Sequence, residues 1–276
     1  MTNKLIYIIL FALSKIPLNT LYSLSTIIYY INHYLINYRL ITVKRNLKMC
    51  FSNYNQDTHK RIINNFYRFL FDVIIEVIKS IKLKEYDIKK RVTISNISVI
   101  EESVKKEKPI ILISSHYANW EWLLLRLSII ENIKLKAVYK PLSNKYLEQI
   151  LFNIRSKFGA ILIRIEKWKY FIIKNSSKPY TYLFLSDQVP NHINNGEKII
   201  FLNKKTLFYQ GAEKIQSKLQ GDVIYVEMLK LKKGYYNIEF KKINSTNITE
   251  EYVKLLEKTI YKQPENWLWS HKRWKR

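Results

Sequence analysis

The sequence predicts an α/β fold, in which a mainly parallel central sheet is flanked by helices and preceded by N-terminal membrane-associated helices. Between residues 110 and 185, apolar runs of strand length alternate with longer segments of helical periodicity, a pattern typical of parallel sheets covered by helices. The N-terminal stretch, in contrast, is almost free of charge. A chain of 276 residues, 47% of them hydrophobic, is long enough for one domain with a sizeable core.

The N-terminal stretch is the candidate membrane-associated part. From Ile16 to Tyr38 the chain carries no acidic or basic residue other than His33, and this length suffices to cross a bilayer at about 1.5 Å per residue. Polar residues interrupt the stretch, so a spanning helix, a helix in the headgroup layer and a helix packed on the protein all remain open. The basic residues from Arg39 to Lys48 favour a cytoplasmic location for the rest of the chain. We expect residues 1–40 to form an anchor or interfacial helices and residues 41–276 to form a single α/β domain.

A second helix is expected from about Asp57 to Ile81, because apolar residues recur there at three- and four-residue steps. We interpret this stripe as core packing rather than as a lipid-binding face. Asp72 and Glu76 are expected elsewhere on the surface of this helix. A charged segment with a short strand near residues 91–94 leads to the next apolar run.

The run Ile110–Ile113 predicts a buried central strand, after which the chain alternates. The expected elements are a helix at 120–130, a strand at 136–139, a helix at 144–158, a strand at 160–165, a helix at 168–175 and a strand at 180–185. Ligands of such sheets gather at the carboxyl ends of the strands. His116, Lys140 and Asp187 each follow a predicted strand, so we expect them at one rim. The polar loop Asn191–Lys198 is predicted to be a mobile flap over a substrate channel.

The C-terminal part is predicted to hold a helix at 211–219, a hairpin of strands 223–229 and 235–239, and a helix at 249–261. The tail then interleaves Trp267, Trp269 and Trp274 with basic residues. Stacking on nucleic-acid bases and placement in a membrane headgroup layer are both open interpretations. No helix-turn-helix, RNP or zinc pattern accompanies the tail, so a membrane or a phosphorylated lipid is favoured over nucleic acid.

The formal charge of +25, from 47 Lys and Arg against 22 Asp and Glu, predicts an anionic partner such as a phospholipid surface, a phosphorylated substrate, an acidic protein or nucleic acid. The only cysteine, Cys50, has no partner for an intramolecular disulfide. The five histidines are scattered without metal-ligand spacing, so neither a metal site nor a cofactor is predicted.

The turn after the central strand carries the candidate chemistry. His116 lies beside the predicted start of a helix, where backbone N–H groups are unpaired and the local field favours anions. The step from His116 to Glu121 turns about 500° on an ideal helix and leaves the two side chains roughly 140° apart. They meet only if the histidine lies off the helix, an arrangement in which a carboxylate holds one ring nitrogen while the other takes a proton. A lone His with a Glu nearby is, however, more often structural.

Further blocks favour the functional interpretation. The segment from His116 to Glu121 resembles the His-x4-Asp/Glu block of glycerolipid acyltransferases, and Asn119-Trp120-Glu121 resembles its version in the bacterial lipid A biosynthesis acyltransferases of the late, lauroyl type. Three more blocks resemble the same family in the same order. They are Tyr139-Lys140-Pro141-Leu142 leading to Arg155 and Phe158-Gly159, then Ser186-Asp187-Gln188 with Phe201 and Gly211-Ala212-Glu213, and finally the tail from Pro264 to Trp274. Ala118 departs from the pattern, because the similar block often carries glycine there.

This resemblance implies a glycerolipid acyltransferase-like fold and an acyltransferase at a bacterial inner membrane, with its catalytic domain on the cytoplasmic side. The expected reaction is O-acyl transfer from an acyl thioester to a lipid hydroxyl. The expected donor is acyl carrier protein, with acyl-CoA as the alternative. The expected acceptor is a lipid A precursor, and another lyso-lipid or an aminolipid is the alternative. A non-catalytic basic protein that binds membrane or nucleic acid is the competing hypothesis from another class.

The catalytic residues are expected to be His116, as general base, and Glu121, which would fix its tautomer. The substrate-binding residues are expected to be Asn119, Arg155, Asp187 and Lys140. Asn119 or the backbone N–H groups of the turn would bind the tetrahedral oxyanion. The resemblance implies that Arg155 binds an anionic group, for which a planar guanidinium suits bidentate contact, and that Asp187 orients this arginine or the acceptor.

Overall fold

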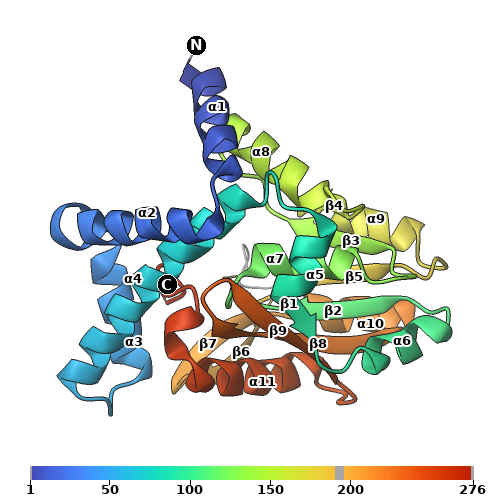
Figure 1. Ribbon diagram of the computed structural model, residues 1–276. Coiled ribbons are helices and arrows are strands. Elements are labelled where there is room, and N and C mark those ends of the chain that lie inside the picture. The colour runs from blue at the N-terminus through green and yellow to red at the C-terminus, as the bar shows by residue number, and fades with distance from the viewer. Residues whose placement is uncertain (1, 190–195, 275–276) are drawn as a thin grey trace.

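A computed structural model describes residues 2–189 and 196–274, and within them seven strands form one central sheet (Figure 1). They are β1 (Val92–Ile94), β2 (Ile110–Ser114), β3 (Leu135–Tyr139), β4 (Ile161–Arg164), β5 (Thr181–Leu185), β8 (Asp222–Lys232) and β9 (Tyr235–Lys242). Their spatial order is β1-β9-β8-β2-β5-β3-β4. All neighbours are parallel except β8 and β9, which form the predicted antiparallel hairpin. The predicted mainly parallel sheet is therefore confirmed.

Strand β2 lies at the centre of the sheet. It pairs in parallel with β5 on one side and β8 on the other, and all five of its residues are buried. A continuous run of isoleucine and leucine suits a strand that is covered on both faces, where no alternation with polar residues is needed. Because β5 and β3 lie next in order, the carboxyl ends of β2, β5 and β3 meet along one edge.

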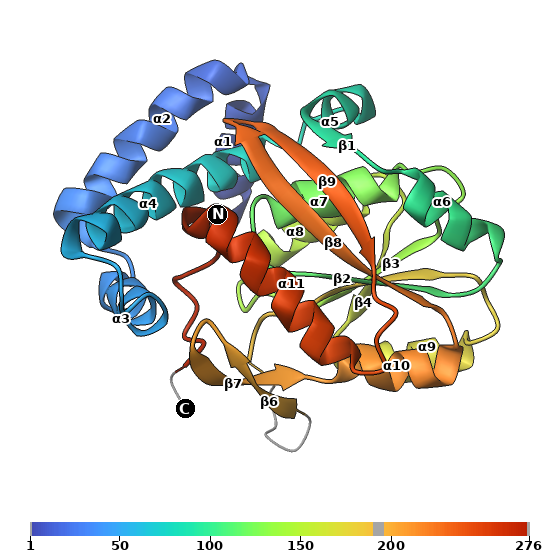
Figure 2. The same ribbon diagram turned by 90° about the horizontal axis from the view of Figure 1, so that it is seen from below.

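Helices cover both faces of the sheet (Figures 1 and 2). Helix α7 lies on one face, whereas α10 and α11 lie on the opposite one. The helices that follow the N-terminal region are α5 (Glu85–Arg91), α6 (Ser98–Lys105), α7 (Trp120–Ser128), α8 (Lys145–Ser156), α9 (Trp168–Lys174), α10 (Gly211–Leu219) and α11 (Ile248–Lys262), with a 3-10 turn at Pro264–Asn266. The bounds of α7 to α11 agree with the predicted helices to within two residues at each end, because amphipathic periodicity and caps such as Asn119 and Asn144 are local signals. Helices α5 and α6 were not predicted, because both are short and lie in a segment rich in charge.

The N-terminal region consists of separate helices instead of one long one. They are α1 (Thr2–Lys15), α2 (Leu18–Ile31), a π-helical turn (Asn32–Ile36), α3 (Leu40–Cys50) and α4 (Gln56–Lys79). Pro17 separates α1 from α2, and Asn37 and Arg39 adopt left-handed conformations before α3. Within residues 2–189 and 196–274, no helix is both long enough and apolar enough to cross a membrane. A single spanning helix from Ile16 to Tyr38 is therefore not what the chain forms.

Helix α2 packs along α4 through polar as well as apolar contacts (Figure 2). Ser25 Oγ donates to Asp72 at 2.6 Å, and the Tyr22 hydroxyl donates to Glu76 at 2.7 Å. The expectation that Asp72 and Glu76 lie on the surface is wrong, because their exposed fractions are 5% and 0%. Helical periodicity places them off the main apolar stripe, and α2 covers that side as well.

Two further expectations change in the C-terminal half. Residues 191–195 of the predicted flap lie outside the described residues, whereas Gly196–Lys198 begin β6 (Gly196–Phe201), which pairs antiparallel with β7 (Lys204–Tyr209). The tail is interior. Trp267 and Trp269 are 3% and 0% exposed, so these two rings are available neither to nucleic-acid bases nor to a headgroup layer.

Candidate active site

His116 and Asp187 face each other at the carboxyl edge of the sheet. His116 follows β2 and Asp187 follows β5, and these neighbouring strands are paired from Ile110 with Thr181 to Ser114 with Leu185. Nδ1 of His116 lies 2.7 Å from Oδ1 of Asp187. The histidine side chain is 19% exposed and the aspartate side chain 3%. A substrate can therefore reach the imidazole while the carboxylate stays out of water.

The contacts of Asp187 determine its charge state. Burial alone would raise the pKa of this carboxyl, but the charge and N–H groups of His116, together with the indole N–H of Trp267, outweigh burial and hold the pKa below its ordinary value. An ionised carboxylate only accepts hydrogen bonds. Asp187 therefore selects the tautomer of His116 that carries its proton on Nδ1, which leaves a lone pair on Nε2 for a reacting proton.

The C-terminal segment supports this pair directly. Nε1 of Trp267 donates to Oδ2 of Asp187 at 2.9 Å, so each carboxylate oxygen has one donor. Leu268 donates its backbone N–H to the His116 carbonyl at 3.1 Å, and Ala118 donates its own to the Asn266 carbonyl at 2.9 Å. The tail therefore fixes both the backbone of the histidine turn and the orientation of the aspartate.

Glu121 has a different partner from the one expected. It forms a two-point ion pair with Arg155, whose Nε and Nη2 lie 2.8 and 2.6 Å from its two oxygens. Burial favours the neutral guanidine, but the charge of Glu121 outweighs it and raises the pKa of Arg155. The partner at the imidazole of His116 is Asp187 instead. Glu121 is in the first turn of α7 and points toward α8, because the turn to the helix carries it away from the histidine.

This ion pair also changes the expectation for Arg155. The fork formed by Nε and Nη2 is filled by Glu121, so it is not open for a bidentate contact with a substrate anion. The guanidinium lies 5.8 Å from the Tyr139 ring at the end of β3. Arg155 therefore joins α8 to α7 beside the rim. Lys140, the next residue after β3, is exposed at the same edge.

Asn119 has a structural role that excludes the expected one. It is fully buried, its Oδ1 caps α7 by accepting from the Trp122 N–H at 2.9 Å, and its Nδ2 donates to Glu76 at 2.6 Å. Its side chain is therefore not available to a tetrahedral oxyanion. Ala118 before it has a φ of 52°, a left-handed conformation that glycine adopts without cost, which explains why glycine suits this position.

Gln188 is a site residue that the sequence interpretation did not single out. Its Nε2 lies 3.2 Å from Nε2 of His116, so its amide donates to the lone pair that a substrate hydroxyl would need. The sequence signal was its place next to Asp187. Trp267 was also missed as a site residue, although a buried tryptophan usually finds an acceptor for its N–H.

An apolar lining adjoins the pair. The ring of Trp120 meets that of His116 edge to face at 5.3 Å. A small pocket beside it is lined by Trp120, Trp267 and the α4 residues Phe66, Phe69, Leu70 and Val73. The pocket has a volume of only about 10 Å³, so it marks an apolar lining beside the imidazole and is not a chain-sized cavity.

The fold and site thus define an α/β protein with a partly exposed histidine, oriented by a buried aspartate, at the carboxyl edge of a parallel sheet. A sequence model of the family described as bacterial lipid A biosynthesis acyltransferase matches residues 1–276, the whole chain. The chain belongs to this family and is an acyltransferase of lipid A biosynthesis. A search of curated protein sequences returns no match.

Proposed function

We propose that this acyltransferase moves a fatty acyl chain from the thioester of acyl carrier protein to a hydroxyl of a lipid A precursor, with His116 as general base. The hydrogen bond of 2.7 Å between His116 Nδ1 and Asp187 Oδ1 is the observation that carries the proposal. It leaves Nε2 as the basic nitrogen on the exposed side of the ring. In this assignment Asp187 is the positioning residue for the base, the task first expected of Glu121.

The reaction begins when the acceptor hydroxyl displaces the amide of Gln188 from Nε2. As the hydroxyl oxygen bonds to the thioester carbon, its proton moves to Nε2, and the buried charge of Asp187 stabilises the resulting imidazolium. The tetrahedral intermediate then loses the thiolate as the C–S bond breaks. The imidazolium returns the proton to that sulfur, so the products are an ester and a free thiol.

The oxyanion needs hydrogen-bond donors other than Asn119. The backbone N–H groups of Trp120 and Glu121 open helix α7, and neither has an acceptor among the described residues. Free N–H groups at a helix start, helped by the helix dipole, suit a developing negative charge. We assign the oxyanion to these two groups.

The acidic donor and the lipid acceptor both agree with the charge of the chain. A net charge of +25 attracts a small acidic carrier protein and an anionic membrane surface. Acyl-CoA offers less surface for such attraction, so acyl carrier protein is the preferred donor in the proposal.

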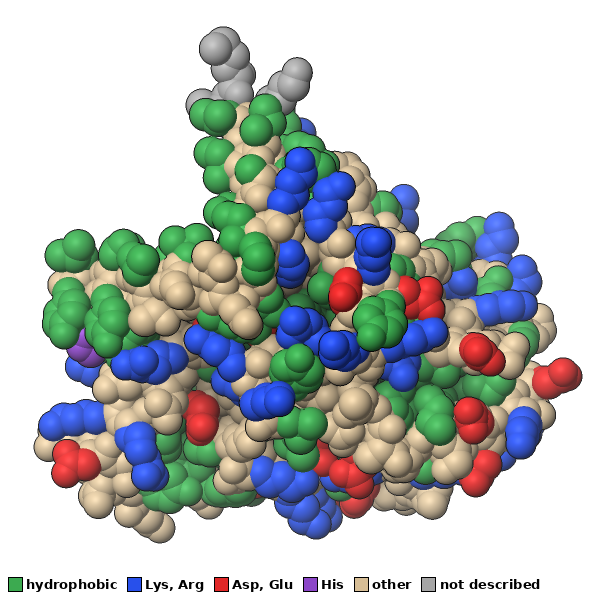
Figure 3. Space-filling model, viewed as in Figure 1, with side chains coloured by type: hydrophobic (Ala, Val, Ile, Leu, Met, Phe, Trp, Pro, Cys, Tyr) green, Lys and Arg blue, Asp and Glu red, His purple; other side chains and the backbone are tan. Residues whose placement is uncertain are grey.

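Membrane attachment is part of the same proposal. Residues Leu5 to Ile9 of α1 are 38–57% exposed, and further apolar side chains are exposed from Ile27 to Ile41. In Figure 3 apolar side chains cover α1 and the far end of α2, with basic side chains beneath them. Such a surface suits an interfacial position in the headgroup layer of a bacterial inner membrane, with the catalytic domain on the cytoplasmic side.

The test is transfer of radiolabelled acyl chains from acyl carrier protein to a tetraacylated lipid A precursor. Wild-type protein is expected to transfer, and His116→Ala to lose about 10²- to 10⁴-fold in rate, the usual contribution of a general base. Lys214→Met, on an exposed face of α10, is the control. Transfer that is unaffected by loss of His116 would refute the mechanism, and transfer from acyl-CoA alone would refute the donor assignment.

A further inference from the structure

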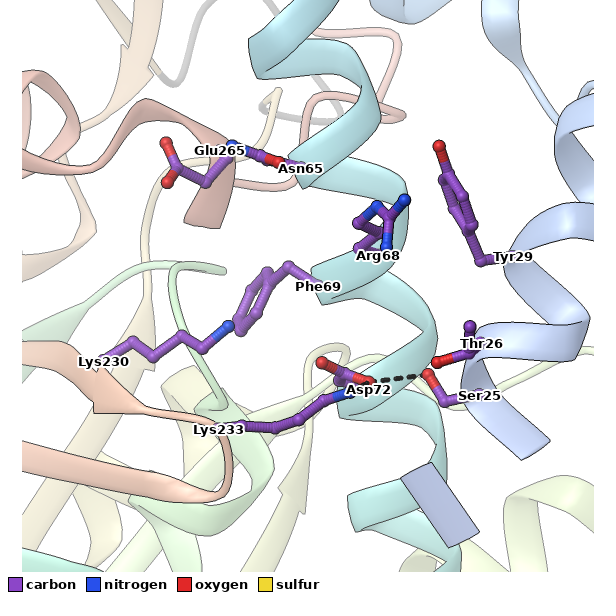
Figure 4. Close-up of a pocket in the computed structure, with 10 residues that line it drawn as sticks. All are labelled: Ser25, Thr26, Tyr29, Asn65, Arg68, Phe69, Asp72, Lys230, Lys233 and Glu265. Atoms are coloured by element: carbon purple, nitrogen blue, oxygen red, sulfur yellow. Dashed lines mark hydrogen bonds and ion pairs between the residues drawn. The ribbon is translucent and has the colours of Figure 1, made fainter. Parts of the chain in front are cut away.

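A second cavity, of about 320 Å³, lies away from the catalytic pair between α2, α4 and the hairpin of β8 and β9. Figure 4 shows that its polar lining comes from all three parts: Asp72 and Arg68 from α4, Lys230 and Lys233 from the hairpin, and uncharged hydroxyl-bearing residues from α2. Glu265, in the turn before the buried tail, completes the lining. The cavity is therefore polar, unlike the small pocket beside His116.

The positive charges of the cavity exceed the negative ones. The negative charge of Asp72 is already compensated, because Lys233 Nζ lies 3.0 Å from its carboxylate and Ser25 donates a hydrogen bond to it. Arg68 and Lys230 form no ion pair with any described residue. Two cations thus face the cavity, against the single carboxylate of Glu265.

Of the two cations, Lys230 is the stronger evidence for an anion site. Its Nζ lies 4.8 Å from the Phe69 ring centre, and it has no oxygen acceptor within the described part of the chain. Burial lowers the pKa of this ammonium, because its charged form lacks compensating hydrogen bonds that a bound anion would supply. An ammonium with free N–H groups at the edge of a cavity is suited to an incoming anion. The Arg68 guanidinium lies over the Tyr29 ring at 4.4 Å, and its side chain is exposed at the edge of the cavity.

The cavity adjoins the active site through one side chain. Phe69 lines both the polar cavity and the apolar pocket that contains Trp120 and Trp267. Trp120 contacts the His116 ring and Trp267 holds Asp187. The polar cavity, the apolar lining and His116 thus follow one another along the molecule. They suit a ligand with an anionic group at one end and a hydrocarbon-bound hydroxyl at the other.

We propose that the cavity binds a phosphomonoester of the lipid acceptor through Lys230 and Arg68, and thereby places the acceptor hydroxyl at His116. The inference rests on the proposed function for the identity of the acceptor. The phosphodiester of the donor's phosphopantetheine shares the same chemistry, so the test separates the two sources.

The kinetic test compares Lys230→Met with Lys214→Met, which removes an equal charge from an exposed position on α10. Loss of one charge-assisted contact to phosphate is expected to lower kcat/KM for the acceptor by about 10- to 100-fold, with KM for the donor unchanged. The control keeps wild-type values. On an acceptor from which the phosphates have been removed, wild type and Lys230→Met should become equal.

Two kinetic results would overturn the inference. One is a rise in KM for the donor instead of the acceptor, which would assign the cavity to phosphopantetheine. The other is an equal loss on phosphorylated and dephosphorylated acceptors, which would mean that Lys230 acts without touching phosphate. Arg68→Met is the second variant, because the Arg68 side chain is exposed at the cavity edge and methionine keeps an unbranched chain against the Tyr29 ring while it removes the charge.

A binding measurement keeps the inference independent of turnover. His116→Ala protein, with and without Lys230→Met, is mixed with detergent micelles that contain either the phosphorylated precursor or its dephosphorylated form. Tighter binding of the phosphorylated form that is lost in the Lys230 variant supports phosphate binding by the cavity, even if no transfer is seen. Absence of transfer would refute only the proposed function. Equal binding of both forms by the Lys230-intact protein refutes the cavity even if transfer is seen.

Discussion

Replacing Asp187 with asparagine tests how the tail and the catalytic pair act together. The Trp267 N–H only donates, and at 2.9 Å it requires an oxygen at the position of Oδ2. In Asp187→Asn the single amide oxygen would turn toward Trp267, so the amide NH₂ would face Nδ1 of His116. The histidine would then carry its proton on Nε2, the nitrogen that must act as base.

The size of the effect has two contributions. In the reversed orientation the amide oxygen faces His116, which permits the active tautomer, but the amide NH₂ then faces the indole N–H of Trp267. These two donors lie against each other in a buried site, at a cost of about 1–3 kcal/mol. Loss of the carboxylate charge removes a charge-assisted hydrogen bond of about 1.5–3 kcal/mol from the imidazolium. With tenfold in rate for about 1.4 kcal/mol, the single-turnover rate should fall about 10²- to 10⁴-fold.

Trp267→Phe provides the decisive comparison. Without the indole N–H, the amide of Asp187→Asn can turn its oxygen toward His116, so the cost of reversing the amide disappears. In this background Asp187→Asn should lower the rate by only about 10- to 100-fold, a coupling of about 1–3 kcal/mol in a double-mutant cycle. ¹⁵N NMR of the histidine would report the tautomer directly. Additive effects, or an Nδ1-protonated histidine in the Asp187→Asn single variant, would refute the reasoning.

Three further predictions concern residues around the same site. Ala118→Val should destabilise the protein by more than about 1–2 kcal/mol in denaturant unfolding, because a β-branched residue is strained at a φ of 52°, while Ala118→Gly should stay near wild type. Arg155→Leu should cost about 3–5 kcal/mol by leaving Glu121 charged and buried, and much of this should return in the double variant with Glu121→Leu. Burial lowers the pKa of His271 to about 4, below its ordinary value of 6.5. As the pH falls, the unfolded state therefore binds the extra proton first, so the free energy of unfolding should be full above pH 6.5 and fall toward pH 4. The fall should be about 1–2 kcal/mol after allowance for the partial exposure of His271. His271→Gln should lack this fall when unfolding is measured across the same pH range.

The burial of the C-terminal tryptophans could not be predicted from the sequence. The spacing of tryptophans and basic residues carries no information on whether the rings face solvent or the interior. Trp267 becomes a site residue only because its backbone forms a short antiparallel bridge with Tyr117, a residue 150 positions earlier in the sequence. This bridge places Trp267 beside the histidine turn. Glu76 and Asp72 were misplaced for the same reason, since α2 covers a helix face that looks polar in isolation.

The sequence by itself determined the strands of the central sheet, the bounds of α4 and of α7 to α11, and the rim at which His116 and Asp187 meet, because apolar runs, periodicity and caps are local signals and parallel strands end on one side. It also determined the family, through ordered motifs. Only the tertiary structure decided which carboxylate holds the histidine. Glu121 is five positions away and Asp187 is 71 positions away, yet the turn into α7 carries Glu121 toward Arg155, while the pairing of β2 with β5 brings Asp187 within 2.7 Å. Proximity along the chain is therefore a weaker guide to a side-chain partner than the register of two neighbouring strands.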